Sequence, residues 1–220
     1  MKFLSLIFTI LWLVFLIAGM AATGPLNTIE QALMYAGKAN MMFYLTYINA
    51  AIVTITAVML FTALYIYYKP MVPAWSAIGV MFVPIYGAMN LVVYLSQVTV
   101  VPRLFQLQTL SEYQAFSQFF LGQAIQQWPG SIVFIVNNLA YAILGLPSII
   151  FGLLMLKSTG VLRLGGFFLA LSGLASIMGF IGIIAQIAWL SKGSLLGGIL
   201  FLLALVPMSL VLLQRTSQTG

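Results

Sequence analysis

The chain contains no cysteine, no histidine and, because both of its acidic residues are glutamates, no aspartate. These absences exclude disulfides, thiol nucleophiles, Ser-His-Asp triads, aspartyl catalysis, and the Cys and His ligand sets of zinc sites and haem. The 12 methionines have no cysteine or histidine beside them, so they predict core packing rather than a soft-metal site. The sequence therefore predicts neither a cofactor nor a bound metal.

Charge is also scarce, with 8 basic and 2 acidic residues among 220. A soluble domain usually carries charge on about a quarter of its residues. Hydrophobic residues make up 63% of this chain and its mean hydropathy is +1.16. There is too little polar surface to cover a water-soluble globule of this length. The composition thus indicates a polytopic membrane protein.

Six segments have the roughly 20 apolar residues that a helix needs to cross a hydrocarbon core about 30 Å thick. Their runs are long and continuous, whereas the strands of a membrane β-barrel are short and alternate in polarity. We therefore expect an all-α helical bundle that forms one membrane domain over residues 1–220. The predicted spans are residues 3–22, 43–68, 72–98, 131–156, 161–190 and 194–213.

The first of these segments has an alternative interpretation, as a cleavable signal peptide. Lys2 precedes an apolar run over residues 3–18, and the small residues Ala18, Gly19, Ala21 and Ala22 lie at its end. The length of the run and the presence of Trp12 favour a retained span. The other five spans keep their orientation in either case.

The basic residues predict which ends of the spans face the cytoplasm. If the amino terminus is cytoplasmic, the inner side carries Lys2, Lys69, Lys157, Arg163 and Arg215, and the outer side carries Lys38, Arg103 and Lys192. This bias follows the positive-inside rule, which is strongest for short loops. Both termini are then cytoplasmic. The net charge of +6 predicts contact with membrane lipid rather than nucleic acid, because no basic stripe is interleaved with aromatics.

Two long outer connections, residues 23–42 and 99–130, contain Glu30 and Glu112. In the second, the spacing of Thr109 and Glu112 is that of a capping box, and it predicts an amphipathic helix over 109–128. That helix either lies in the outer interface as a structural lid or gates a pocket between the spans. Its apolar face would consist of Leu110, Tyr113, Phe116, Phe120, Ala124 and Trp128, and its polar face of Glu112, Gln114, Gln118, Gln126 and Gln127.

Uncharged polar side chains recur at helical spacing inside the spans. An amide in hydrocarbon is costly without a partner, so these stripes should face other helices or water. One interpretation is an outward-opening polar cavity, and the other is hydrogen bonding between helices, worth about 0.6 kcal/mol per bond. The predicted ligand-binding residues are Asn49, Tyr86, Asn90, Tyr94, Gln97, Asn137, Asn138, Tyr141 and Gln186.

Small residues four apart also predict close packing of the fifth span. Ser172 with Ser176, and Ala175 with Gly179, are small-xxx-small pairs. Ser172, Ser176 and Gly179 lie on one helical stripe with Gln186, so the same face is a candidate for both packing and the cavity.

The position of the charges limits the activities that remain. Every Lys, Arg and Glu lies at a predicted helix end or in a loop, which disfavours a proton or metal-ion pump. An enzyme would have to use Glu30 and Glu112, and nothing local brings them together. We therefore predict a non-enzymatic membrane protein that binds a small uncharged or amphipathic ligand or lipid from the outer side. The alternatives are a scaffold or accessory subunit that contacts partner helices and, less favoured, an outward-facing enzyme.

Two stretches resemble a known family. YIYYKPMVPAWSAIGVMFVPIYGAMNLVVYLSQ (residues 65–97) and LLMLKSTGVLRLGGFFLALSGLASIMG (residues 153–179) are similar to the inner hairpins of six-span bacterial membrane proteins of the domain-of-unknown-function 4386 type. The resemblance covers the order of spans, the long outer loop and the tyrosine-lysine turn. It implies a bacterial inner-membrane location and no particular reaction. The chain departs from that family in lacking an acidic residue within its spans.

Overall fold

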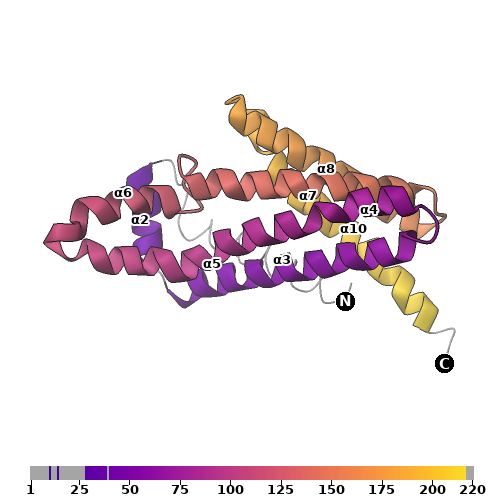
Figure 1. The fold of residues 1–220 in the computed structure, drawn as a ribbon, viewed down its shortest axis with the longest axis horizontal. Coiled ribbons are helices and arrows are strands. Elements are labelled where there is room, and N and C mark those ends of the chain that lie inside the picture. The colour runs from indigo at the N-terminus through magenta and orange to yellow at the C-terminus, as the bar shows by residue number, and fades with distance from the viewer. Residues whose placement is uncertain (1–9, 11–13, 15–27, 39, 217–220) are drawn as a thin grey trace. The chain divides into compact units, whose positions relative to one another are not determined.

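The computed structural model describes residues 10, 14, 28–38 and 40–216, and every regular element in that part of the chain is a helix (Figure 1). Five stretches are long and apolar enough to cross a membrane, so the chain is an all-α, multi-pass integral membrane protein. These stretches are Met41–Tyr68, Pro73–Gln108, Ile132–Leu156, Val161–Ile184 and Ala188–Ser209. The predicted first span, residues 3–22, lies outside the described residues except for Ile10 and Val14.

The helices divide between two compact units, which we describe separately. Three long helices, α3 (Met41–Tyr68), α5 (Val83–Gln108) and α7 (Ile132–Leu156), each contribute residues to both units. Among the described residues, unit 1 contains 55–87 and 138–216, and unit 2 contains 10, 14, 28–38, 40–54 and 88–137.

Unit 2 contains α2 (Ile29–Gly37), which lies in the connection that we expected to be a loop. A capping box starts this helix: the Gln31 backbone N–H donates to the Thr28 hydroxyl over 3.3 Å, and the Thr28 N–H donates to Gln31 Oε1 over 3.2 Å. The Thr-x-x-Gln spacing is the usual sequence signal for this motif. Glu30 is therefore a first-turn helical residue, as exposed as predicted but not in a loop.

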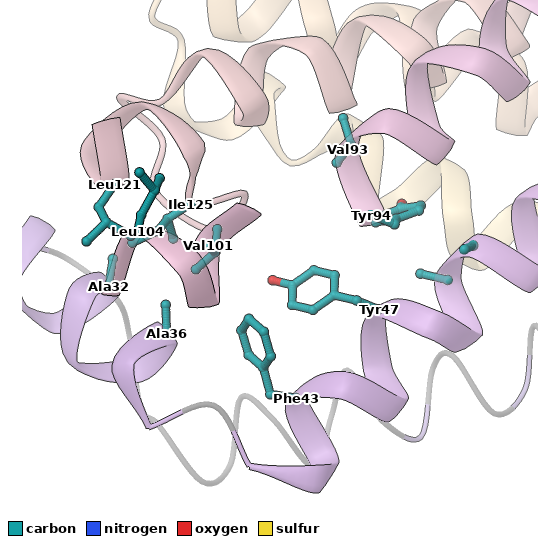
Figure 2. Close-up of a cluster of buried hydrophobic side chains, with 12 residues drawn as sticks. Ala32, Ala36, Phe43, Tyr47, Val93, Tyr94, Val101, Leu104, Leu121 and Ile125 are labelled. Atoms are coloured by element: carbon teal, nitrogen blue, oxygen red, sulfur yellow. The ribbon is translucent and has the colours of Figure 1, made fainter. Parts of the chain in front are cut away.

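The core of unit 2 is a cluster of alanines, aliphatic side chains and aromatic rings. Figure 2 shows Phe43 and Tyr47 of α3 on one side of it and residues of α5 on the other. The alanines of α2 are small enough to let that helix approach closely. The buried members are Ala32, Ala36, Phe43, Tyr47, Ala50, Ala51, Val93, Tyr94, Val101, Leu104, Leu121 and Ile125.

The predicted helix over 109–128 differs in the structure at both ends. Helix α5 continues through Pro102 to Gln108, a 3-10 turn (η1) follows at Ser111–Tyr113, and α6 spans only Gln114–Ala124. The expected capping box is absent, because the Thr109 hydroxyl donates to the Gln106 carbonyl over 2.8 Å instead of accepting from a first-turn amide. The hydroxyl thus completes the end of α5 rather than the start of α6.

Helix α6 also exposes part of the face that we predicted to be apolar. Its buried residues are Ser117, Leu121 and Gly122, and a Cβ added at Gly122 would lie 3.1 Å from Ile29 of α2. The rings of Phe116, Phe119 and Phe120 are 53%, 65% and 43% exposed. They form a cluster with centroid separations of 4.5 Å between Phe116 and Phe120 and 5.5 Å between Phe119 and Phe120.

Unit 1 packs around aromatic rings and glycines. Phe61 of α3 contacts Phe151 of α7 at 6.0 Å between ring centroids, and Phe201 of α10 (Gly193–Thr216) at 6.3 Å. Helix α4 (Pro73–Met81) ends just before α5 begins. Pro84, in the first turn of α5, has no N–H to continue the α4 hydrogen-bond ladder, which explains this break.

Helix α8 (Val161–Ile184) meets α7 through glycines on both helices. A Cβ added at Gly173 would collide with the backbone oxygen of Gly145, and one added at Gly152 would lie 2.6 Å from the Ala170 nitrogen. Neither backbone can move away as a flexible side chain could. These glycines therefore set how closely α7 and α8 approach.

A neighbouring face of α8 packs as closely against α10, as the small-residue spacing predicted. The Ser172 hydroxyl donates to the Gly197 carbonyl over 2.7 Å, and a Cβ at Gly197 would collide with the Ser176 hydroxyl. A Cβ at Gly179 would collide with the backbone of Ser194. For Ser172 and Ser176, helix packing is thus the interpretation that the contacts support.

Helix α8 ends earlier than the predicted 161–190, in a Schellman turn. The Ile187 N–H donates to the Gly182 carbonyl over 2.8 Å and the Gln186 N–H to the Ile183 carbonyl over 3.2 Å. This geometry places Gln186 in the left-handed region at φ 56°, a position usually taken by glycine. A short helix, α9 (Ala188–Ser191), then leads into α10.

Substitution of Gly173 by alanine should destabilise the fold by about 1–3 kcal/mol, because the added methyl meets the Gly145 carbonyl oxygen and overpacks the interface. Thermal unfolding in detergent micelles measures the change. The control is Leu174→Ala, the next residue on α8, whose side chain is 51% exposed. An equal melting temperature for Gly173→Ala and the wild type would contradict the close packing.

Candidate functional site

The predicted site residues fall in both units. Unit 2 contains Asn49, Asn90, Tyr94, Gln97 and Asn137, and unit 1 contains Tyr86, Asn138, Tyr141 and Gln186. All except Gln186 are buried or half-buried. Gln186 is exposed in the Schellman turn, beyond the end of the helical stripe that contains Ser172 and Ser176. The periodicity failed there because α8 ends at Ile184, before the position that would continue the stripe.

Gln97 forms the clearest polar contact in unit 2. Its side chain is 0% exposed and bonds both to Ala124, the last residue of α6, and to Gln126 just beyond it. Nε2 donates to the Ala124 carbonyl over 2.8 Å, and Oε1 accepts from the Gln126 backbone N–H over 3.1 Å. One amide therefore satisfies a donor and an acceptor that the end of α6 leaves open.

Two residues outside the predicted set extend this arrangement. The Tyr47 hydroxyl donates to Gln126 Oε1 over 3.3 Å. The Ser131 hydroxyl donates to the Ile125 carbonyl over 2.7 Å and accepts from the Phe134 N–H over 2.9 Å, which caps α7. A serine before a long apolar run is a signal for such a cap. No sequence pattern points to Tyr47.

Most of the other predicted residues are engaged within the protein. The Tyr94 ring lies 6.4 Å from that of Tyr47 in unit 2, and the Tyr86 ring lies 6.1 Å from that of Tyr141 in unit 1. Asn49 and Asn138 also have interaction partners. For these side chains, contact inside the protein accounts for their burial.

Asn90 and Asn137 differ from the rest. Asn90 is 0% exposed, yet neither its Oδ1 nor its Nδ2 has a hydrogen-bond partner. Asn137 is 6% exposed and its Oδ1 is likewise unpartnered. Each unsatisfied buried group costs about 1–3 kcal/mol, and almost all such groups in proteins are paired. Both residues belong to unit 2, and they are the predicted site residues whose chemistry the protein leaves open.

The two carboxylates lie on exposed surface of unit 2. Glu30 is in the first turn of α2 and Glu112 is in η1. The backbone N–H of Glu30 and the Thr28 hydroxyl hold the pKa of the Glu30 carboxyl below its usual range. Glu30 is therefore ionised at neutral pH and unsuited to act as a general acid. Among the described residues, no three His, Cys, Asp or Glu side chains are grouped to hold a metal.

Replacing Gln97 with leucine should destabilise unit 2 by about 1–3 kcal/mol, because the Ala124 carbonyl and the Gln126 N–H both lose their partner. Hydrogen exchange localises the effect, and the Gln126 amide should exchange about tenfold faster. Gln118→Leu, at an exposed position of α6, serves as the control. Unchanged exchange at Gln126 would show that Gln97 does not hold this turn.

Acidification should loosen the start of α2. The pKa of Glu30 is lower in the folded state than in the unfolded state, so its stabilising effect is complete above the unfolded value and disappears as pH falls through the folded one. Hydrogen exchange of α2 amides, corrected for intrinsic rates, should increase as pH falls below the ordinary pKa of a glutamate. Glu30→Gln should remove this dependence, and Glu112→Gln should retain it.

Comparison with known proteins identifies no relative of this chain: no family model, no curated protein and no solved structure matches it. Its function is therefore inferred from its own side chains and their contacts.

Proposed function

We propose that this integral membrane protein binds a small uncharged or amphipathic molecule, or a lipid, at the buried amides of Asn90 and Asn137, without catalysing a reaction. The unpartnered amide of Asn90 is the observation that carries the proposal. Asn90 has an unused donor and an unused acceptor at 0% exposure. Such a group is stable in a membrane protein when a molecule that can both donate and accept occupies the space beside it.

The charge distribution restricts the chemistry of that molecule. The charged side chains whose exposure the structure describes are all exposed: Glu30, Lys38, Lys69, Arg103, Glu112, Lys157, Arg163 and Lys192. None of these groups is therefore buried near the two amides to neutralise a charged ligand, and a buried charge without a partner is strongly unfavourable. A neutral hydroxyl or amide group, carried on an apolar body, is the best complement to Asn90 and Asn137.

The proposed topology has six spans, both termini in the cytoplasm of a bacterial cell, and the ligand arriving from the outer side of the inner membrane. The distribution of basic residues supports it. The short turns at Lys69 and at residues 157–163 carry three basic residues, and the positive-inside rule is strongest for short loops. Membership of the family that residues 65–97 resemble remains part of this proposal.

A scaffold that contacts partner helices is the second candidate. The exposed cluster of Phe116, Phe119 and Phe120 favours it, since aromatic side chains are enriched where proteins meet. The same rings would also suit the outer membrane interface. An enzyme is the weakest candidate, because Glu30 and Glu112 are both exposed and no described contact joins them.

The wild-type protein should bind the neutral single-chain lipid monoolein, whose glycerol hydroxyls can donate to and accept from an amide. We expect monoolein to raise the melting temperature of the protein in a maltoside micelle. The shift should disappear in Asn90→Leu combined with Asn137→Leu, because leucine offers no hydrogen bond. Thermal unfolding over a monoolein titration measures both effects, and native mass spectrometry counts the bound molecules.

Two comparisons make the experiment decisive. Asn90→Ala removes the amide without adding bulk, so its loss of response would separate lost hydrogen bonding from overpacking. Gln118→Leu makes an equivalent amide-to-leucine change at an exposed position and should leave the response intact. A wild type that does not respond to monoolein, or variants that respond normally, would contradict the proposal.

A further inference from the structure

Unit 1 carries three basic residues on two turns. Lys69 follows α3 directly, Lys157 follows α7, and Arg163 lies in the first turn of α8. All three side chains are exposed. The two acidic residues of the chain, Glu30 and Glu112, both lie in unit 2. No carboxylate side chain of unit 1 is therefore present to neutralise these cations.

Contacts between α3 and α7 bring the two turns together. The Tyr68 ring, in the last residue of α3, lies 6.3 Å from the ring of Phe151 of α7. The Ser158 side chain lies near the Tyr68 hydroxyl. Lys69 follows Tyr68 and Lys157 precedes Ser158, so both lysines flank the same contact. Figure 1 draws both turns at one end of the helices of this unit.

The Tyr68 hydroxyl is a second polar feature of this place. Tyr68 is 6% exposed, and its buried oxygen lacks a hydrogen-bond partner of suitable geometry. A tyrosine hydroxyl is both a donor and an acceptor, and a buried one normally finds a partner. The Tyr68 hydroxyl, without a hydrogen bond of good geometry, thus belongs to the contact that Lys69 and Lys157 flank in the sequence.

Neighbouring aromatics place the turns at the level of lipid headgroups. The Lys69 ammonium lies 5.6 Å from the centre of the Tyr65 ring, a cation–π contact that restrains it. Tyr67 and Trp75 are 48% and 60% exposed. Tyrosine and tryptophan gather at the membrane–water interface, where basic side chains meet lipid phosphates.

We propose that Lys69, Lys157 and Arg163, together with the Tyr68 hydroxyl, bind the phosphate of an anionic phospholipid. The guanidinium can make paired hydrogen bonds to phosphate oxygens, and the lysines contribute positive charge. Zwitterionic lipids suit the site less well, because their ammonium group would meet three cations and no carboxylate. This site is separate from Asn90 and Asn137, so either proposal can fail without the other.

Native mass spectrometry of the full chain in micelles that contain equal amounts of phosphatidylglycerol and phosphatidylcholine tests the site. The wild type should retain phosphatidylglycerol preferentially. Lys157→Gln and Arg163→Gln should each lower this preference about fivefold, and the double variant more, since each cation adds attraction for anionic lipid. The control is Lys192→Gln, which neutralises an exposed lysine of unit 1 at the end of α9 and should bind like the wild type. Equal preference in the double variant and the wild type would overturn the proposal.

Two further measurements test the role of the Tyr68 hydroxyl and the source of the phosphate. Tyr68→Phe keeps the ring that packs on Phe151 and removes the hydroxyl, so a loss of preference at an unchanged melting temperature would support a direct bond from Tyr68. An unchanged preference would remove Tyr68 from the site.

Addition of sn-glycerol 1-phosphate or inorganic phosphate separates the two sources of phosphate. If either displaced the lipid at micromolar concentration, the site would be one for a soluble anion and the lipid assignment would be wrong.

Discussion

The need to pair polar groups where no water is available governs this structure. Hydroxyls on the long helices satisfy it locally: Thr54 donates to the Ala50 carbonyl over 3.0 Å and Ser148 to the Leu144 carbonyl over 2.8 Å. The longer side chain of Gln97 donates weakly within its own helix, to the Val93 carbonyl over 3.4 Å, and also reaches across to the end of α6. Polar residues of similar appearance in the sequence thus have different roles, which depend on how far their side chains reach.

The two units meet this constraint in different ways. In unit 1, glycines and serines bring helices so close that backbone groups themselves become partners, as when Ser172 donates to Gly197. In unit 2, side chains form the hydrogen bonds to backbone groups, and Gln97 and Ser131 hold the turn after α6 in this way. Unit 1 is therefore sensitive to added volume, whereas unit 2 is sensitive to the loss of single hydrogen bonds.

Composition and periodicity were sufficient to predict the class of fold and five of its membrane helices, because a long apolar run has few other stable conformations. The same patterns were misleading at helix ends. Thr109 has the spacing of a capping residue, but its hydroxyl bonds backward to Gln106, and Gln186 continues a stripe that the helix does not reach. Ends depend on which of several nearby groups a side chain contacts, and spacing alone does not decide among them. The capping box of α2 was readable from Thr28 and Gln31, but a short helix in a connection has no long apolar run to draw attention to it.

The predicted site shows the same division between what spacing reveals and what only contacts reveal. Helical spacing correctly predicted that residues such as Asn49, Asn90 and Gln97 turn inward, because hydrocarbon penalises the alternative. It could not separate Gln97, whose amide is fully used by the turn after α6, from Asn90, whose amide is unused. Both are amides with 0% exposure, seven residues apart on one helix. What distinguishes them is the presence of an open backbone donor and acceptor beside one and not the other. Gln97 is therefore accounted for by folding, whereas the unpartnered amide of Asn90 is the basis of the proposed binding site.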